Sequence, residues 1–533
     1  MRTFKLSLQI IFYVLIFALF VSRSASSAFT HDENQFIAAG QLLADHGLLP
    51  YLDYPYTHMP YGVAFYALSA SISNYDFLAG RLLNALAWVL CSLLIPQTVR
   101  LIAKDGKASL SACDPTFPQL LAEFVLVFVF LNHPIMGHID GPALNHSYAT
   151  LFGLLAILLF ARLVGLGFSS SRVSFVSGLF ASLAAFIRLN YAALAVVLLL
   201  VLLLHAATDR SSRRFSAFPP FIAGLVAAGV PAVVLAALAP EHFLYTNLIY
   251  IRLNTIYYQE MGFKLNMTLS SKLQSFAGLV LGSPIDIILY AVLVFFGVVA
   301  VIRFVKTRSS GSLIDLALAG FAATLAVSAF APTPTQPQYF FAPLPFLLVI
   351  LGVLGLRLAG PHPVAFTAAS LVVLAALFAS VKVVNPLSEI TFLASPSKWT
   401  PIQIHSFDET LKGYVPDGRF LSLLPMLPLE AGYDVYPFTA AGGFPWRTSL
   451  LLTSERRAQY GVTSPRELLQ ILDHDAPIGI LTGLESTNDG FVRNDLGGLE
   501  APFVAYATSH GYEPIPLQAR FLRRTVTLWV KQP

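Results

Sequence analysis

Long apolar runs recur along the first 384 residues of the chain and are separated by short polar segments. A helix needs about 20 mostly apolar residues to cross a bilayer, so each run of this kind is a candidate membrane span. About eleven spans follow, at residues 6–21, 77–96, 120–136, 143–163, 173–187, 191–205, 218–238, 285–304, 313–331, 340–356 and 364–381. The pattern therefore predicts a polytopic α-helical membrane domain over residues 1–384.

The pattern changes after residue 384, where short apolar stretches alternate with polar ones. Residues 420–424, 478–481 and 525–530 have the composition of strands. Ser464 followed by a proline is typical of a helix start, and the leucines that come next form an apolar stripe. We expect residues 385–533 to form a separate α/β domain, whose length of about 150 residues is usual for one domain.

Charge and composition narrow the class of protein. Charged residues make up 12% of the chain, against roughly 25% in soluble proteins. Of the acidic residues, 14 lie in residues 1–384 and 15 in residues 385–533, so the membrane domain is acid-poor. A net charge of +4 creates no field that attracts a polyanion, and we expect no nucleic-acid partner. Two cysteines, Cys91 and Cys113, are too few for a disulfide framework.

Lysine and arginine concentrate in the loops on the same side as the N-terminus, and loops of that kind face the cytoplasm. The N-terminus is then cytoplasmic and the C-terminal domain periplasmic, in a multi-pass protein of the inner (plasma) membrane. Three outer segments are long enough to carry chemistry, namely residues 23–76, residues 239–284 and the tail. Residues 60–72 are too short to span, which predicts a helix lying along the outer interface.

Asp32 and Glu33 follow the first span and precede a helical pattern of apolar residues. Residues 1–28 also resemble a signal peptide, but we expect them to stay as an anchor, and either outcome leaves the pair outside. Two interpretations are open: carboxylates stabilise a helix N-terminus, and a carboxylate at the end of a lipid-accessible cavity can act as a general base. Adjacent side chains point different ways on a helix, so one would face the cavity while the other caps or orients.

Asp140 lies in a short outer loop, and Asn145 and His146 begin the next helix. An ionisable group at membrane depth is costly and usually functional, although a solvated aspartate near a helix N-terminus is an open alternative. The histidines at 133, 138 and 146 have a spacing that is a weak metal signal, and hydrogen-bonded or solvated histidines explain them better.

Basic and aromatic residues also gather at the outer ends of the spans. Arg81, Arg188 and Arg252 lie there, and the planar fork of an arginine suits a phosphate or pyrophosphate. Snorkelling to the lipid headgroups is the open alternative. Gln338 and Tyr339 precede the tenth predicted span, where an aromatic belt explains the tyrosine as well as a site does.

Several short motifs occur in an order that carries a family resemblance. They are Asp-Glu at 32–33, Pro-Tyr-Leu-Asp-Tyr at 50–54, Met-Pro-Tyr-Gly at 59–62, Gly-Arg-Leu-Leu-Asn at 80–84, the lone Asp140, and Gln-Tyr-Phe-Phe-Ala-Pro at 338–343. This order resembles the GT-C superfamily of membrane glycosyltransferases. The most similar branch holds protein mannosyltransferase-like, aminoarabinose-transferase-like and rhizobial lipopolysaccharide sugar transferase-like proteins. The resemblance covers roughly residues 1–350, and the tail resembles the periplasmic domain of some members.

The resemblance implies a transferase that takes a sugar from a polyprenyl-phosphate carrier and gives it, with inversion, to an extracytoplasmic acceptor (lipopolysaccharide, another glycan, a lipid or a protein). It implies Asp32 as the base, with Glu33 and Asp140 as further catalytic acids. Arg81 corresponds to the family's phosphate contact, and we add Arg188 and Arg252 as candidates for that role. Contacts to the carrier or substrate are expected from Tyr51, Asp53, His58, Asn145, Gln338 and Tyr339.

Two departures leave the phosphate cradle open. The lysine of many relatives is replaced by His58-Met59, and a basic-aromatic pair before the late span is Gln338-Tyr339 here. A divalent metal assists some relatives, but this sequence requires neither a metal nor another cofactor.

Two other classes of function are weighed against the transferase. A secondary transporter or lipid flippase predicts charges at the membrane midplane and an internal repeat between the two halves, and the sequence has neither. A noncatalytic scaffold would bind a partner through its outer domain. Within that domain, the Gly- and aromatic-rich loop 438–446 either contacts carbohydrate or packs against the membrane domain, and we expect packing.

Overall fold

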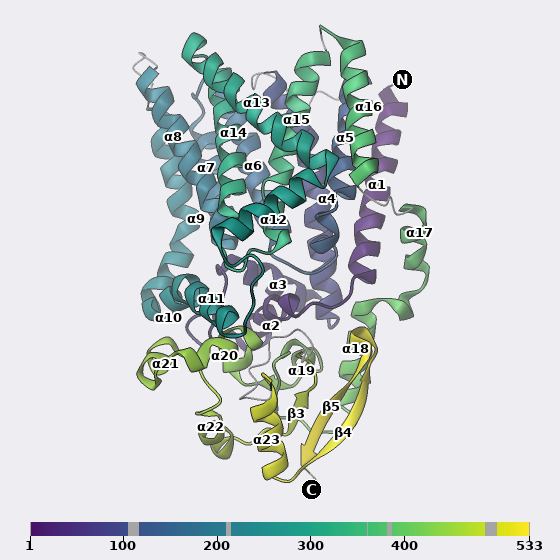
Figure 1. Cartoon of the computed structure of the whole chain (residues 1–533), viewed down its shortest axis with the longest axis vertical. Coiled ribbons are helices and arrows are strands. Elements are labelled where there is room, and N and C mark those ends of the chain that lie inside the picture. The colour runs from purple at the N-terminus through teal and green to yellow at the C-terminus, as the bar shows by residue number, and fades with distance from the viewer. Residues whose placement is uncertain are drawn as a thin grey trace.

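The computed structural model describes residues 2–104, 117–208, 215–359, 361–380, 386–485 and 498–531. Within these residues, nine helical segments are long and apolar enough to cross a membrane. They contain α1 (Arg2–Ser26), α4 (Asp76–Ala103), α6 (His146–Gly165), α8 (Ala192–Thr208), α9 (Phe218–Leu238), α13 (Pro284–Thr307), α14 (Ser310–Ser328), α15 (Leu344–Ala359) and α16 (Pro363–Ser380). These helices form one bundle, and the C-terminal domain lies at one end of it (Figure 1).

The predicted polytopic helical fold is confirmed, with one refinement of the span count. Two of the eleven predicted runs, α5 (Phe117–Asn132) and α7 (Ser171–Ile187), are apolar helices of 16 and 17 residues. They pack beside the longer helices but fall short of spanning length on their own (Figure 1). The protein is therefore a multi-pass membrane protein with nine full-length candidate spans among the described residues.

Small residues allow close helix packing where α7 crosses α9. A Cβ atom on Gly178 would lie 2.2 Å from the carbonyl oxygen of Phe221, and one on Gly224 would lie 2.0 Å from that of Phe175. Glycine at both positions lets the two backbones touch, which is the usual way membrane helices gain packing energy in lipid. The pair is a fixed unit of the bundle.

Acidic residues near the span ends are paired with basic neighbours on other helices. Glu123 accepts hydrogen bonds from Arg100 at 2.5 Å and from Tyr13 at 2.7 Å. Asp315 lies 2.5 Å from Arg303 and 2.9 Å from Arg357. A carboxylate at membrane depth is tolerable only when it is paired in this way, so these groups hold helices together.

A layer of shorter helices separates the bundle from the tail (Figure 1). It contains α2 (His31–His46), α3 (Tyr61–Ile72), α10 (Pro240–Leu244) and α11 (Tyr250–Glu260), and α12 (Leu269–Leu281) follows in the chain. The helix expected at residues 60–72 is present as α3. It packs so closely on α2 that a Cβ at Gly40 would lie 2.4 Å from the carbonyl carbon of Tyr66.

The tail contains a five-stranded mixed sheet with helices around it, which confirms the predicted α/β domain. Its strand order is β2-β1-β3-β5-β4. The strands are β1 (Arg419–Leu421), β2 (Asp434–Val435), β3 (Gly479–Thr482), β4 (Tyr512–Ala519) and β5 (Arg524–Lys531). β1 pairs in parallel with β2 and β3, while β5 runs antiparallel to β3 and β4. All three predicted strands are present, as β1, β3 and β5.

The tail helices are α17 (Pro386–Thr391), α18 (Thr400–Leu411), α19 (Met426–Glu430), α20 (Gly443–Thr448), α21 (Ser454–Tyr460), α22 (Leu468–His474) and α23 (Ala501–Ser509). The helix expected at Ser464 starts four residues later, at Leu468. The Ser464 N–H donates to the Glu467 carboxylate at 2.9 Å, so a turn precedes the helix. The predicted domain boundary at residues 384–385 lies outside the described residues, as does Cys113, whereas Cys91 is buried in α4.

The tail is docked onto the outer helices through polar and aromatic contacts. The side chain of Asn34 on α2 accepts the N–H of Met426 at 3.1 Å. The N–H of Phe77 at the start of α4 donates to Glu430 at 3.1 Å, and Tyr75 stacks on His405 with ring centres 3.8 Å apart. These contacts join segments more than 300 residues apart and bring the tail against the N-terminus of α2.

Candidate active site

The N-terminus of α2 presents Asp32 and Glu33 in opposite ways. The Glu33 carboxylate accepts the N–H of Thr30 at 3.2 Å, and its side chain is fully buried. The Asp32 side chain is 43% exposed, and among the described residues its carboxylate lies close to the neighbouring His31 ring, at 3.4 Å. The two side chains therefore point in different directions, as expected: Glu33 caps the N-terminus of α2, while the Asp32 side chain is partly exposed.

Glu33 forms a closed ion pair with Arg81 of α4. The guanidinium donates to both carboxylate oxygens, at 2.8 Å from Nε and 2.7 Å from Nη2. Its other N–H groups donate to the carbonyl oxygens of Ser24, Ser27 and Ala28. An arginine has five N–H donors, and these bonds use all five.

This arrangement argues against the predicted roles of Glu33 as a catalytic acid and of Arg81 as a phosphate contact. Arg81 has no N–H left for a donor phosphate, and both partners are completely buried. The second Glu33 oxygen also accepts the N–H of Ala143 at 2.7 Å, so the pair fastens the loop before α6 to α2 and α4. We therefore treat Glu33 and Arg81 as a structural pair rather than as a catalytic acid and a phosphate ligand.

Asp140 forms an ion pair with Arg23. Its carboxylate lies 2.7 Å from Arg23 of α1, and Arg23 in turn donates to Glu389 at 2.9 Å and to the carbonyl oxygen of Leu131 at 2.7 Å. Burial raises the pKa of Asp140 above its ordinary value, and Arg23 opposes that shift. No described contact joins Asp140 to Asp32, so the structure does not bring these two predicted acids together.

Arg188, another predicted phosphate contact, has hydrogen-bond donors that no described residue uses. Its Nη1 donates to the Asn145 side chain at 2.7 Å and lies 3.2 Å from Nδ1 of His146. No described residue accepts a hydrogen bond from its Nε or Nη2. Asn145 is itself held by a bond to the carbonyl oxygen of Ile187 at 3.3 Å. The guanidinium is thus fixed from one side and has donors to spare on the other.

Asp32 and Tyr339 both lie within electrostatic range of Arg188. Tyr339 is on the 3-10 turn Pro337–Phe341, before α15. Gln338 on the same turn is partly exposed and makes no polar contact with a described residue. The structure therefore brings together three predicted residues from segments that are far apart in the chain: Asp32, Arg188 and Tyr339.

His58 borders this group as a neutral ring. Burial and the Arg188 charge lower the pKa of His58 to about 3. The ring packs on Phe36 at 4.8 Å, and His58 interacts electrostatically with His146. The Nε2 atom of His146 is buried, and no described residue forms a hydrogen bond with it. The neutral His58 ring adds no second positive charge beside Arg188, so the guanidinium can attract an anionic ligand.

Tyr51 and Asp53 shape the loop that carries His58. Tyr51 is fully buried at a positive φ of 69°, and its hydroxyl donates to the carbonyl oxygen of His58. The Asp53 carboxylate accepts the N–H of Leu49 at 2.7 Å and so closes a turn. Neither side chain reaches Asp32 through a described contact. Arg252 is exposed on α11, and no described residue forms an ion pair with it.

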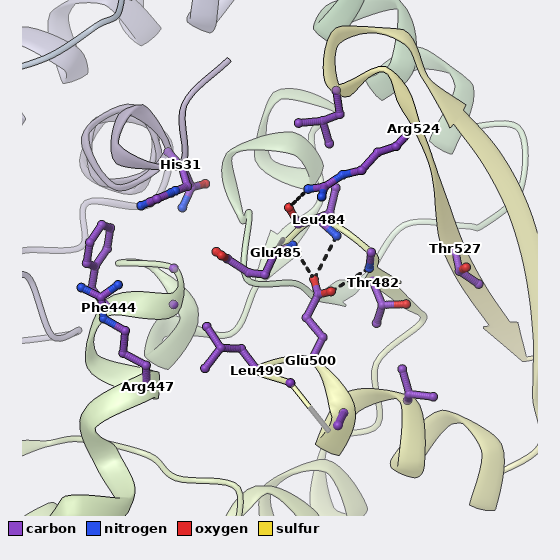
Figure 2. A pocket seen from close by; sticks show the side chains of 18 of the residues that line it. His31, Phe444, Arg447, Thr482, Leu484, Glu485, Leu499, Glu500, Arg524 and Thr527 are labelled. Carbon is purple, nitrogen blue, oxygen red and sulfur yellow. Dashed lines mark hydrogen bonds between the residues drawn. The ribbon is translucent and has the colours of Figure 1, made fainter. Parts of the chain in front are cut away.

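A cavity of about 700 Å³ opens beside Asp32, between the membrane domain and the tail. Thr30, His31 and Asn34, which flank Asp32 in the chain, line one side of it, and the opposite side includes Glu485 and Glu500 of the tail (Figure 2). Phe444 packs on His31 with ring centres 5.5 Å apart. The loop 438–446 therefore packs against the membrane domain, as expected, and also lines the cavity.

Sequence reasoning missed the tail residues of this cavity. Arg447 and Glu485 carry no local motif, because each follows an ordinary helix or strand pattern. The aromatic loop before Arg447 was the one signal in this part of the chain. Among the described residues, no group of three or more histidine, cysteine, aspartate or glutamate side chains is placed to hold a metal ion.

Searches with the sequence match no protein-family model and no curated protein. Comparison with solved structures finds ArnT from Cupriavidus metallidurans bound to undecaprenyl phosphate, with a TM-score of 0.54 and 12% identity, over 98% of both chains. The chain has the fold of ArnT. The apo form of ArnT gives a TM-score of 0.53 at 11% identity over 98% of both chains.

The oligosaccharyltransferase from Archaeoglobus fulgidus, tethered with an acceptor peptide, gives a TM-score of 0.48 at 12% identity, over 95% of this chain and 72% of the other. The resemblance to GT-C glycosyltransferases expected from the motif order is thus confirmed for the fold by ArnT. The likeness to ArnT also extends to residues 385–533, since it covers nearly the whole chain.

Proposed function

We propose that the protein is a membrane glycosyltransferase that moves a sugar from a polyprenyl-phosphate donor to an acceptor on the outer, periplasmic side of the inner membrane. The observation that carries the proposal is that Asp32 and Tyr339 lie within electrostatic range of Arg188, an arginine with hydrogen-bond donors that no described residue uses. The ArnT fold supports it, since the solved ArnT is bound to undecaprenyl phosphate. The acceptor class stays open at this level: a glycan, a lipid or a protein.

Arg188 is our candidate for the donor phosphate. Its free Nε and Nη2 groups can form charge-assisted bonds to phosphate oxygens, while Asn145 and His146 hold the opposite side of the guanidinium. A developing negative charge on the leaving phosphate is stabilised best by a donor that is already oriented. The neutral state of His58 matters for the same reason, because a second charge there would compete for the anion. Tyr339 is our candidate for a contact to the carrier.

Asp32 is our candidate for the general base. Its carboxylate is exposed, whereas Glu33 and Asp140 are both committed to arginines. In the proposed step, the acceptor hydroxyl loses its proton to Asp32 and its oxygen bonds to the anomeric carbon. The bond from that carbon to the phosphate oxygen breaks, and its electron pair leaves with the lipid phosphate. One displacement of this kind inverts the anomeric centre.

The transporter and flippase alternative has no comparable support. It needs ionisable groups free to bind substrate or ions inside the membrane. The acidic residues near the span ends are paired instead, Glu123 with Arg100 and Asp315 with Arg303 and Arg357. Asp286 faces His133 at 3.1 Å.

The test replaces Asp32 with asparagine in the full-length protein and measures transfer from a polyprenyl-phosphate sugar. Loss of a general base lowers the rate typically 10²–10⁴-fold, and binding of undecaprenyl phosphate should persist because Arg188 is intact. Asp45→Asn is the matched control, since Asp45 is an exposed carboxylate at the other end of the same helix. Wild-type transfer by the Asp32 variant would exclude this residue as the base.

A second variant tests the phosphate contact. Arg188→Met removes the oriented donors, and loss of one such donor typically costs about 10²–10³-fold in rate. Arg188→Lys keeps the charge without the planar fork and should recover only part of the binding. Undecaprenyl phosphate binding that is equal in wild type and Arg188→Met would contradict the assignment.

A further inference from the structure

The cavity beside Asp32 is lined by residues of the membrane domain and of the tail, which are far apart in the sequence. His31 belongs to α2 of the membrane domain. Arg447 lies in α20 of the tail, and Glu485 lies just past β3 in the tail (Figure 2). The proposed phosphate contact Arg188 does not line it. A volume of about 700 Å³ is in the range of cavities that hold a small-molecule ligand. Asp32 does not itself line this space, but its neighbours Thr30 and His31 do, and Glu485 lies within electrostatic range of Asp32.

Glu485 is aimed into this compartment by a rigid turn. The Glu500 carboxylate accepts three successive backbone N–H groups, those of Gly483 at 2.7 Å, Leu484 at 3.2 Å and Glu485 at 3.3 Å. Gly483 has a φ of +84°, which a side chain would strain. The Glu485 side chain then runs away from Glu500 towards His31 and Phe444 (Figure 2).

The Glu485 carboxylate has a carboxylate's full capacity to accept hydrogen bonds. No described residue donates one to it, although His31, Arg447 and Arg524 lie within electrostatic range. Burial raises the pKa of Glu485, and these cations oppose the shift. The carboxylate oxygens line the cavity and no described residue donates to them, so a ligand that donates hydrogen bonds can bind there.

Arg447 supplies donors on the facing wall. Its Nη2 donates to Asn254 at 2.8 Å and to the Tyr250 hydroxyl at 3.2 Å, while no described residue accepts a hydrogen bond from its Nη1. The guanidinium also lies over the rings of Phe444 at 4.7 Å and Tyr258 at 5.4 Å. Arg447 is therefore fixed in place with a donor unused.

The hydrogen-bonding groups on the two walls, the Glu485 carboxylate and the Arg447 guanidinium, indicate the class of ligand. A carboxylate only accepts hydrogen bonds and an arginine only donates them, whereas each sugar hydroxyl does both. Aromatic rings from Tyr257, Tyr258 and Phe444 line the same space and can pack against the apolar faces of a sugar ring. An anionic headgroup would be opposed by Glu485, and an extended peptide would require an open sheet edge or groove.

We propose that this cavity is the acceptor site and that the acceptor is a glycan, whose hydroxyls are held by Glu485 and Arg447 while one of them reaches Asp32. This rests on the proposed function, because the site needs Asp32 as the base. Glu500 acts as a positioning residue for Glu485. The tail is then part of the active site and supplies acceptor specificity.

The experiment uses the full-length protein in lipid nanodiscs and two probes. The first is a lipid-free oligosaccharide released from lipopolysaccharide by mild acid, and the second is undecaprenyl phosphate. Wild type is compared with Glu485→Gln, Arg447→Lys and the control Glu409→Gln, in which an exposed tail carboxylate is changed. Oligosaccharide binding is measured by saturation-transfer NMR titration, lipid binding by native mass spectrometry, and folding by thermal unfolding.

We expect the Glu485→Gln and Arg447→Lys variants to bind the oligosaccharide at least tenfold more weakly, with undecaprenyl phosphate binding unchanged in both and the unfolding temperature unchanged in Glu485→Gln. Wild-type oligosaccharide affinity in Glu485→Gln would overturn the proposal. So would a wild-type protein that prefers a serine-containing peptide or phosphatidylethanolamine vesicles over the oligosaccharide. Failure of wild type to bind undecaprenyl phosphate would instead count against the proposed function, and the acceptor role would fall with it.

Discussion

Replacing Glu33 with glutamine tests whether the two adjacent acids of α2 have separate roles. The carboxylate and the Arg81 guanidinium are both completely inaccessible and joined by two bonds of 2.7 and 2.8 Å. Glutamine keeps the shape but leaves a buried arginine without its counter-charge. Breaking a buried ion pair by removing one partner typically costs about 3–5 kcal/mol. Glu33→Gln should therefore destabilise the protein strongly.

The expected shift in melting temperature follows from the chain length. An unfolding entropy of roughly 2.1 cal/mol/K per residue, over 533 residues, gives about 1.1 kcal/mol/K. A loss of about 3–5 kcal/mol then lowers the melting temperature by roughly 3–5 °C. Asp32→Asn, whose side chain is 43% exposed and makes no buried contact, should leave the melting temperature within 1 °C or so.

The assay combines thermal unfolding in detergent with transfer activity per folded molecule. The single variant Arg81→Gln and the double variant Glu33→Gln/Arg81→Gln complete a mutant cycle, and residues in direct contact should show a coupling of about 0.5–3 kcal/mol. Glu33→Gln should keep most of its activity below its melting temperature, whereas Asp32→Asn should lose activity without losing stability. The reasoning is refuted if Glu33→Gln melts like wild type and is inactive, since Glu33 would then be catalytic.

Three further outcomes follow from the packing and the charges. Asp140→Asn should lower the melting temperature but keep transfer activity per folded molecule, because Asp140 pairs with Arg23 rather than facing the cavity; inactive but fully stable protein would contradict this. Gly224→Val should prevent α7 and α9 from docking, with little folded protein recovered in fluorescence size-exclusion chromatography, whereas Gly278→Ala, at an open position, should be recovered normally. His58 has a pKa lowered to about 3 by burial and by Arg188, so it contributes stability above its unfolded pKa of about 6.5 that is lost as the pH falls towards 3. The His58→Gln variant should therefore show a smaller drop in melting temperature than wild type between pH 7 and pH 4.5, and an equal drop would rule out this role.

Much of the fold could be predicted because membrane spans leave a strong local signal. Each apolar run became a helix, and the short run at 60–72 became α3. The strands of the tail were also predictable, since β1, β3 and β5 each have a typical apolar pattern. The run predicted at 120–136 was too long at its end, because α5 ends at Asn132 and the following His133-Pro134 begins a loop.

The site was predicted only in part, because partners lie far apart in the chain. The sequence placed Asp32, Arg188 and Tyr339 at the predicted outer ends of the spans, and in the structure Asp32 and Tyr339 lie within electrostatic range of Arg188. The motif order did not predict that all five N–H groups of Arg81 donate hydrogen bonds to the Glu33 carboxylate and to three backbone carbonyl oxygens. An arginine at the start of a span has the same local pattern whether it binds a phosphate or a carboxylate.

The sequence alone determined that the chain crosses the membrane many times and carries an α/β domain at its C-terminus, because hydrophobic periodicity reports on burial one segment at a time. It also placed carboxylates and arginines at one face of the membrane. Only the tertiary structure decided which of these charges neutralise each other and which stay open. That choice depends on distances between residues such as Glu33 and Arg81, or His31 and Phe444, which no local pattern records.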